Sequence, residues 1–287
     1  MNSAWVDFLG GQITYYDAGG VRTRCLEAGQ GEAVFLFHGI GGHSEAFIKN
    51  IVPMSKHYHV VAVDLLGHGL TDKPDGLYEI PDYVQHVKNL MKAMGIDQAH
   101  FVGESLGGWI SFWLAYEHPE LIRSFISVTG AGLLVDDFDV LQSDALKRLR
   151  NLSQRSSSEV TRDSVRDRLR WLFVDPDKSI TEELVEIRYR LYANPEWQRI
   201  QPKIQSMMNP EVGSKYYIKP EHLQKLTVPT YFLWTRHNPS TQWDTAERAS
   251  RYVPGAKFHV MEDCGHWPQY EKPEEFHDLI HRFIQAL

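Results

Sequence analysis

The sequence predicts an α/β protein with a mostly parallel central sheet, helices on both sides of it and an inserted helical lid. Strand-like apolar runs alternate with helical patterns over the first half of the chain, which is typical of parallel sheets. From about residue 133 to 215 no clear buried strand is found, and the stretch is rich in Arg, Asp, Ser and Leu. Strand and helix order then returns. We therefore expect a core formed by residues 1–132 and 216–287, and a lid of residues 133–215 above the carboxyl edge of the sheet.

The individual elements follow from periodicity and turn signals. Gly19-Gly20 separates two short strands and predicts a hairpin, and a continuous apolar run after it predicts a strand buried on both faces. In chain order, the expected strands are Ile13–Asp17, Val21–Ala28, Ala33–Phe37, Val60–Val63, Ala99–Gly103, Phe125–Val128, Val228–Trp234 and Phe258–Met261. The expected core helices are Glu45–Ser55, Ile80–Met94, one from Leu106 to about His118, and Pro273–Leu287.

Composition excludes several classes of protein. The 287 residues carry a net charge of −7 without a clustered basic stretch, so a nucleic-acid partner is not expected. The two cysteines are far apart in sequence and predict neither a disulfide framework nor a metal site. No signal peptide and no apolar run of about 20 residues is found, so we expect a cytoplasmic protein with no membrane partner.

A nucleophilic serine is indicated by Gly103–Gly107, which matches the pattern G-x-S-x-G. The motif lies between an apolar strand and an apolar helix. A sharp strand-to-helix turn forces the serine backbone into a strained conformation, and small neighbours avoid a clash with it. Ser105 is therefore the expected nucleophile, and the alternative is an ordinary glycine-rich helix start.

An oxyanion hole is expected from two main-chain N–H groups. One belongs to Leu106, directly after the serine, and the other to Ile40, which follows His38-Gly39 at the end of a buried strand. The Gly41-Gly42 pair lets the chain approach a ligand closely, and Gly39 and Gly41 are expected to contact substrate. The alternative is a simple glycine turn.

His266 is the expected general base among 14 histidines, because it lies between the last strand and the final helix. Imidazole can take the serine proton and return it near neutral pH. The residue that would orient the base is less clear, because Asn238 occupies the position where an Asp is expected. An amide oxygen can accept the Nδ1–H of the histidine but brings no negative charge. Asp244, Asp136 and Asp137 remain alternatives, and Asn238-Pro239 could simply form a turn.

With these residues placed, the chain resembles the meta-cleavage product hydrolases. These are α/β-hydrolase-fold enzymes that hydrolyse a carbon–carbon bond in 2-hydroxy-6-oxohexa-2,4-dienoates from aromatic ring cleavage. The resemblance covers nearly the whole chain. It rests on Phe37–Gly39, Asp64–Gly69, Gly103–Gly107, the lid stretch Asp177–Arg188, and Cys264–Gln269 with Glu271 and Lys272.

The resemblance implies roles for two further residues. Arg188 would bind the substrate carboxylate, which suits a guanidinium because it can donate two parallel hydrogen bonds. Trp267 would form a wall of the pocket. The substrate would be a small molecule with a carboxylate, and the reaction would need no cofactor and no metal. A homodimer stays open.

Three departures from the family pattern keep other functions open. Glu104 precedes the nucleophile where the family often has Asn, the glycine loop lacks Gly-Pro-Gly, and Asn238 holds the acid position. The alternatives are a carboxylesterase or lactonase, a ligand-binding receptor on a hydrolase scaffold, and a cofactor-free oxygenase that uses a histidine base.

Overall fold

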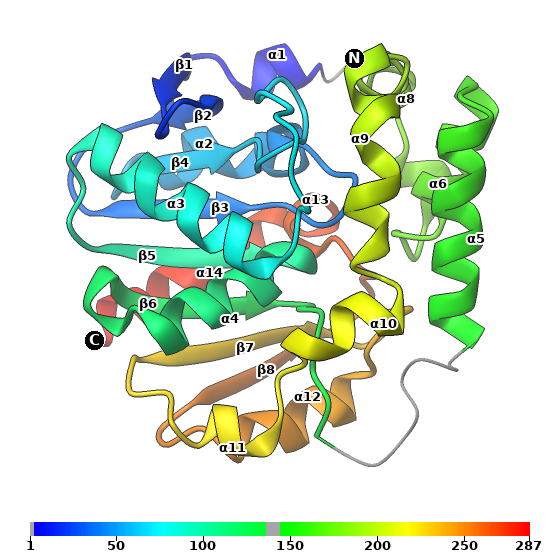
Figure 1. The fold of residues 1–287 in the computed structure, drawn as a ribbon. Coiled ribbons are helices and arrows are strands. Elements are labelled where there is room, and N and C mark those ends of the chain that lie inside the picture. Colours follow the sequence, from blue (N-terminus) through cyan, green and yellow to red (C-terminus); the bar gives the residue numbers. More distant parts are fainter. Residues whose placement is uncertain (1–2, 136–143) are drawn as a thin grey trace.

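An eight-stranded sheet forms the centre of the computed structural model, which describes residues 3–135 and 144–287 (Figure 1). Its strand order is β1-β2-β4-β3-β5-β6-β7-β8. The pairs β1–β2 and β2–β4 are antiparallel, and the other pairs are parallel. The strands are β1 Gln12–Asp17, β2 Arg22–Ala28, β3 Ala33–Phe37, β4 His59–Val63, β5 Ala99–Glu104, β6 Ile122–Val128, β7 Thr230–Thr235 and β8 Lys257–Met261.

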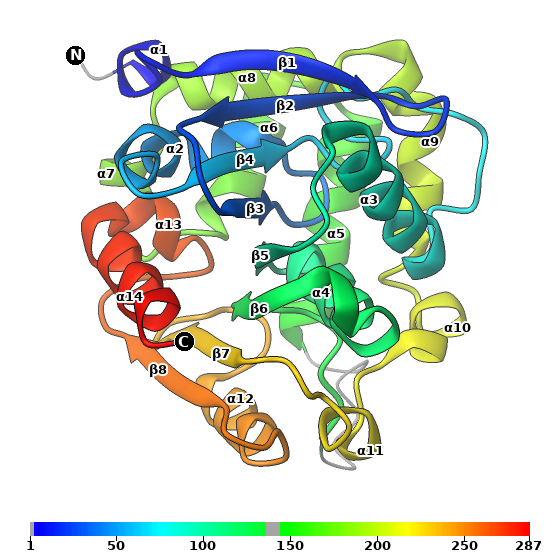
Figure 2. The same ribbon diagram turned by 90° about the vertical axis from the view of Figure 1, so that its left-hand side faces the viewer.

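Helices cover both faces of this sheet. Figure 2 shows α3 and α4 on one face and α2, α13 and α14 on the other. A short helix, α1, precedes the first strand, and α11 and α12 flank β7 in sequence. The bounds are α1 Ala4–Asp7, α2 Ile48–Met54, α3 Ile80–Met94, α4 Leu106–Glu117, α11 Pro220–Leu223, α12 Trp243–Ser250, α13 Pro268–Glu271 and α14 Pro273–Gln285.

The middle of the sheet is apolar because β3 and β5 are buried on both faces. Phe35 stacks on Phe101 with ring centroids 5.3 Å apart, and Phe37 packs on the same ring at 5.6 Å. A parallel strand between two helical layers must be apolar on both sides, and this is the pattern that the sequence contains.

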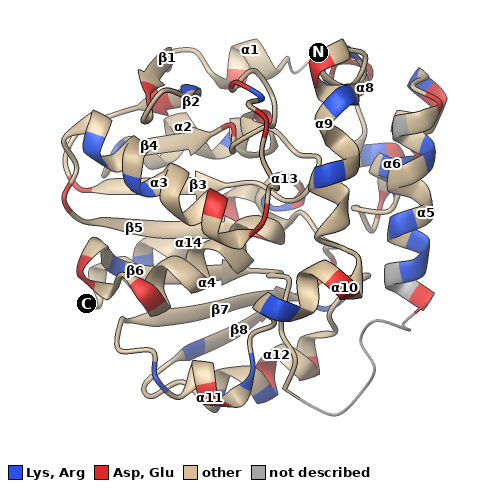
Figure 3. Ribbon diagram, in the orientation of Figure 1, with Lys and Arg blue, Asp and Glu red and all other residues tan. Residues whose placement is uncertain are grey.

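The first six α-helices that the structure describes after β6 lie to one side of the sheet, near the ends where the parallel strands stop (Figures 1 and 2). They are α5 Asp144–Ser158, α6 Arg162–Arg170, α7 Pro176–Ser179, α8 Glu182–Tyr192, α9 Pro195–Ser206 and α10 Pro210–Gly213. Figure 3 shows charges of both signs along these helices. We keep residues 133–215 as the proposed lid. A parallel β-bridge between Leu133 and Ile218, near the two boundaries of this segment, supports the proposal.

The predicted elements agree with the structure over most of the core, and the differences are local. The expected helix Glu45–Ser55 begins as a 3₁₀ turn, Ser44–Phe47, before α2. Strand β6 begins at Ile122, three residues before the expected start, and α12 was not predicted. Within the described part of the chain, no helix combines the length and the apolar character needed to cross a lipid bilayer.

Candidate active site

Ser105 occupies a strained turn between β5 and α4. Its backbone has φ 52° and ψ −113°, a conformation that non-glycine residues rarely adopt. A Cβ atom on Gly103 would lie 2.3 Å from the Gly107 carbonyl oxygen, and one on Gly107 would lie 2.3 Å from that of Phe37. Both positions therefore require glycine, and the strained turn is the one that the G-x-S-x-G pattern predicts for a nucleophile.

The two proposed oxyanion donors lie beside this serine. Leu106 is the first residue of α4, where main-chain N–H groups have no partner within the helix. The N–H of Ile40 has no acceptor among the described residues, and both residues line the same cavity as Ser105. This arrangement can stabilise an oxyanion.

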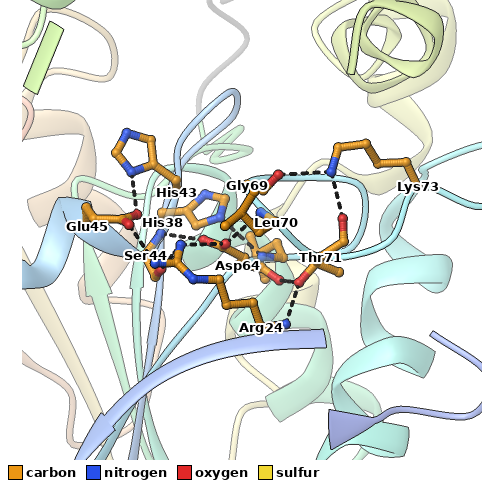
Figure 4. Close-up of polar contacts among 11 residues, drawn as sticks. Arg24, His38, His43, Ser44, Glu45, Asp64, Gly69, Leu70, Thr71 and Lys73 are labelled. Atoms are coloured by element: carbon orange, nitrogen blue, oxygen red, sulfur yellow. Dashed lines mark hydrogen bonds and ion pairs between the residues drawn. The ribbon is translucent and has the colours of Figure 1, made fainter. Parts of the chain in front are cut away.

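A buried polar network holds the loop that contains Ile40 (Figure 4). The Asp64 carboxylate accepts hydrogen bonds from the N–H groups of Ser44 (2.7 Å) and Leu70 (2.8 Å). Arg24 donates to the same carboxylate at 3.1 Å and to Glu45 at 2.7 Å. The network joins β2, the glycine loop and the loop after β4, so it fixes the position of the glycine loop.

His38 belongs to this network and has a structural role. Its Nε2 accepts the N–H of Leu65 at 3.2 Å, so its Nδ1 carries the proton and donates to the Gly39 carbonyl at 2.8 Å. Burial lowers the pKa of His38 to about 4. A neutral ring with both nitrogens engaged positions the oxyanion loop and is not available as a base.

His266 is held by contacts from the core and from the proposed lid. Its main-chain N–H donates to the Leu172 carbonyl of the lid at 2.7 Å, and its carbonyl accepts from the Thr129 hydroxyl at 2.9 Å. The ring packs edge-on against Trp171 at 5.3 Å. These contacts come from two segments that are far from His266 in sequence, and His266 as a residue is only 4% exposed.

Asn238 is the partner of Nδ1 in His266, at 2.7 Å from its Oδ1. The Nδ2 of the same amide donates to the Thr241 carbonyl at 2.6 Å, which turns Oδ1 toward the ring. Nδ1 is therefore the protonated nitrogen, and Nε2 is directed away from Asn238. Asp244 pairs instead with Arg248 at 3.2 Å, and the other two alternatives, Asp136 and Asp137, lie outside the described residues.

The other ring nitrogen, Nε2, lies 3.0 Å from Oε1 of Glu104. Glu104 is completely buried, and neither of its oxygens meets hydrogen-bond geometry with any described group. Ser105 and His266 line the same two cavities, but no hydrogen bond joins their side chains in the described structure. The proposed pair is thus in one site, with a carboxylate beside the nitrogen that would take the serine proton.

Two cavities meet at Ser105 and His266. The larger has about 820 Å³ of space free of protein atoms, part of it open to solvent, and the smaller has about 270 Å³ on the same measure. The larger is mainly apolar, and its lining includes Trp109, Leu133, Leu149, Met207, Met208 and Tyr217. The smaller is charged, and its lining includes Gly39, Glu104, Arg168, Arg188 and Trp267.

Two buried guanidinium groups line the charged cavity. Arg188 is 2% exposed, and its guanidinium makes no hydrogen bond or ion pair with the described residues. It lies 5.1 Å from the centre of the Trp267 ring. Arg168 donates its Nε to Ser153 at 3.2 Å and leaves Nη1 without a partner. Burial lowers the pKa of Arg168 to about 10, so it still carries its charge at neutral pH.

Sequence reasoning missed Arg168 and the contact of Glu104 with His266. Arg168 is one of four arginines in α6, and no local pattern distinguishes it. The sequence shows Glu104 as an unusual residue before the nucleophile, but it does not predict that Glu104 lies next to the general base. Gly41, expected at the substrate, does not line either cavity. Its carbonyl accepts the Tyr192 hydroxyl of α8 at 2.8 Å.

Comparison with known proteins gives a family match. The α/β-hydrolase fold family matches residues 32–273. The chain is 30% identical, over 274 residues, to 2-hydroxy-6-oxo-6-(2'-aminophenyl)hexa-2,4-dienoic acid hydrolase of Metapseudomonas resinovorans, covering 94% of this chain and 90% of that protein. It is also 30% identical to 2-hydroxy-6-oxo-6-phenylhexa-2,4-dienoate hydrolase of Comamonas testosteroni, covering 90% of each.

Solved structures agree with this match. A serine hydrolase involved in carbazole degradation is 28% identical with a TM-score of 0.80, covering 96% of this chain and 100% of that one. A meta-cleavage product hydrolase from Pseudomonas fluorescens IP01 is 25% identical with a TM-score of 0.82, covering 97% and 99%. A carboxylesterase from Bacillus subtilis, 19% identical with a TM-score of 0.80 over 99% and 96%, shares the fold.

Proposed function

Since this chain belongs to the α/β-hydrolase fold family, we propose that it hydrolyses a carbon–carbon bond in a 2-hydroxy-6-oxohexa-2,4-dienoate. Relatives that match over about 90% of the chain or more are named as hydrolases of such compounds. They do not favour the esterase, receptor or oxygenase interpretations.

The observation that carries the proposal is the unpaired Arg188 guanidinium in the cavity beside Ser105. A buried charge without a partner is costly, so such a group is retained where a ligand of opposite charge completes it. A planar carboxylate fits a guanidinium through two parallel hydrogen bonds. An esterase for neutral substrates has no need of this cation.

The two cavities suggest how the substrate is seated. Its carboxylate would lie in the charged cavity with Arg188 and Arg168, and its 6-substituent would lie in the apolar cavity. The C6 carbonyl would then be near Ser105 and the N–H groups of Ile40 and Leu106. Binding energy at both ends of the substrate would hold the reacting carbon in place.

The proposed reaction has two stages. His266 first moves a proton from the 2-hydroxyl to C5 and converts the dienol to its keto form. Ser105, or a water that it holds with His266, then adds to the C6 carbonyl, and the oxyanion hole stabilises the tetrahedral species. The C5–C6 bond breaks with its electrons passing into the dienol. Overall, water is consumed and a carboxylic acid and a 2-hydroxypenta-2,4-dienoate are released.

The decisive assay mixes the protein with a yellow 2-hydroxy-6-oxo-6-phenylhexa-2,4-dienoate and, separately, with a chromogenic ester. We expect rapid loss of the yellow colour and much slower ester cleavage. Replacing Arg188→Ala should lower kcat/KM for the dienoate by about 100-fold, in line with the loss of a charge-assisted hydrogen-bond pair, and leave ester cleavage nearly unchanged.

Arg190→Ala is the matched control, because Arg190 is on the same helix but is exposed and pairs with Glu186 at 2.8 Å. It should leave both activities at the level of the original protein. Equal loss of both activities in Arg188→Ala would argue against the carboxylate role. Turnover of neither compound by the unaltered chain would overturn the proposed function.

A further inference from the structure

We propose that Glu104 supplies the negative charge that stabilises protonated His266, from the Nε2 side of the ring. This inference rests on the proposed Ser105–His266 chemistry and names a further residue for it. It concerns which group holds the charge during catalysis. The substrate itself can be identified independently of it.

The first step of the argument is the missing charge on the Nδ1 side. Asn238 accepts the Nδ1–H at 2.7 Å and fixes the tautomer, but an amide is neutral. The side chain of Asp244 is engaged with Arg248 and is not a partner of the ring. Protonation of His266 therefore creates a buried cation that the Nδ1 side does not balance, and such a cation is costly.

The second step is the carboxylate on the other side. Oε1 of Glu104 lies 3.0 Å from Nε2, close enough for a strong Coulomb interaction between buried groups. The contact nevertheless fails hydrogen-bond geometry, so the carboxylate lies beside the direction in which an Nε2–H would point. Because Ser105 and His266 line the same cavities, we infer that this direction is left for a proton from Ser105 or from water. Glu104 can thus stabilise the imidazolium without blocking the transfer that forms it.

The third step is the charge of the whole cavity. Arg168 reaches it from α6 and Arg188 from α8. The ring of His38, close enough to Glu104 to interact electrostatically, is neutral and adds no charge. Two guanidinium groups and one carboxylate leave a single positive charge, which a substrate with one carboxylate would neutralise. Glu104 therefore has a competing role, which is to balance Arg168, and the experiment must separate the two.

The proton balance is simple and needs no other reactant. A proton leaves the Ser105 hydroxyl or a water, its oxygen forms a bond to the C6 carbonyl, and the proton bonds to Nε2. The resulting imidazolium lies between the Asn238 oxygen and the Glu104 carboxylate. When the C5–C6 bond breaks, the imidazolium gives its proton to the dienolate oxygen. If Ser105 is the nucleophile, a water then hydrolyses the acyl–serine ester, which releases the carboxylic acid and restores the Ser105 hydroxyl.

The test is whether a carboxylate on one side of the ring can replace one on the other. Glu104→Gln removes the charge with little change in shape and should lower kcat for the dienoate by about 100-fold, the size expected for impaired acid–base catalysis. Glu104→Gln combined with Asn238→Asp returns a carboxylate to the Nδ1 side, and kcat should recover to within about 10-fold of the original protein.

A charge at position 238 lies across the ring and does not replace the Coulomb interaction of Glu104 with Arg168. If Glu104 only balances Arg168, the double variant stays as slow as Glu104→Gln, and this result would overturn the inference. Unchanged kcat in Glu104→Gln would do the same. Glu104→Asn repeats the test with a smaller amide if the first variant does not fold by circular dichroism.

Two controls make the outcome specific. Glu27→Gln removes another buried carboxylate, one that pairs with Nε2 of His59 at 2.9 Å on β2 and β4, far from the cavities in sequence and fold. It should leave kcat unchanged. The rate at which a fluorophosphonate labels Ser105 gives a second readout without the dienoate. This labelling rate should fall in Glu104→Gln and recover in the double variant, even if the dienoate is the wrong substrate.

Discussion

At the scale of single residues, the base is defined by what touches its two ring nitrogens. Asn238 can replace an aspartate in one respect only, because its oxygen accepts a proton from Nδ1 as a carboxylate would. The Thr241 carbonyl fixes which end of the amide faces the ring. The tautomer of His266 therefore depends on the hydrogen bond between Asn238 and Thr241, which does not involve the imidazole itself.

We expect Asn238→Leu to lower kcat for the dienoate by about 100-fold, because the Nδ1–H loses its acceptor and the ring can adopt the wrong tautomer. Binding of substrate should change little. The exposed Gln242, which donates to the Asn238 main-chain carbonyl at 3.3 Å, offers a control, and Gln242→Leu should retain full kcat. A steady-state comparison of kcat and KM decides, and a normal kcat in Asn238→Leu would mean that another group orients the ring.

At the scale of elements, the proposed lid and the core are joined by polar contacts at the site itself. The Leu172 carbonyl accepts the main-chain N–H of His266, and the Tyr192 hydroxyl donates to the Gly41 carbonyl. A Cβ on Gly41 would lie 2.6 Å from that hydroxyl, so the glycine loop is shaped to receive α8. Lid position and oxyanion-loop position are therefore coupled.

Replacing Tyr192→Phe should lower the free energy of unfolding by about 1 kcal/mol, the usual net value of one buried hydrogen bond. It should also lower kcat/KM for the dienoate, because α8 carries Arg188. Tyr189→Phe, on the same helix, should change kcat/KM much less, since Tyr189 packs on Arg162 and not on the glycine loop. Urea unfolding and initial rates test both expectations, and equal effects of the two variants would argue against the coupling.

At the scale of the whole molecule, several histidines are buried and neutral. Burial lowers the pKa of His38 and of His86 to about 4, each from 6.5. In the unfolded chain these two histidines take up protons near pH 6.5, whereas in the folded chain they take them up only near pH 4. Stability is therefore complete above pH 6.5 and is lost as the pH falls toward 4.

Between pH 6.5 and 4.5 each of these histidines should remove about 2 kcal/mol from the free energy of unfolding. Urea titrations at pH 7, 6, 5 and 4.5 measure the decline. His86 contacts Thr23 at 2.7 Å and is outside the active site, so His86→Gln isolates one contribution. The decline in this variant should be smaller than in the original chain by that amount, and an identical pH dependence would contradict the assignment.

Local chemistry made much of this protein predictable. The strained serine turn needs glycine on both sides, buried parallel strands need continuous apolar runs, and the order of serine and histidine follows the fold. Each glycine or apolar signal spans only a few residues, and the order signal needs only positions along the chain, so Ser105, Leu106, Ile40 and His266 could be proposed as site residues from the sequence. The starts of β6 and β7 were less predictable, because pairing with neighbouring strands sets where a strand begins.

The sequence by itself determined the fold class, the parallel order of the core and the identity of the expected nucleophile and base. Only the tertiary structure decided what surrounds them. Arg168 enters the cavity from α6, and Glu104 lies at Nε2 while Asn238 lies at Nδ1. Such contacts join positions that are tens to more than a hundred residues apart, and their energies depend on distance and burial. No short sequence pattern records either quantity.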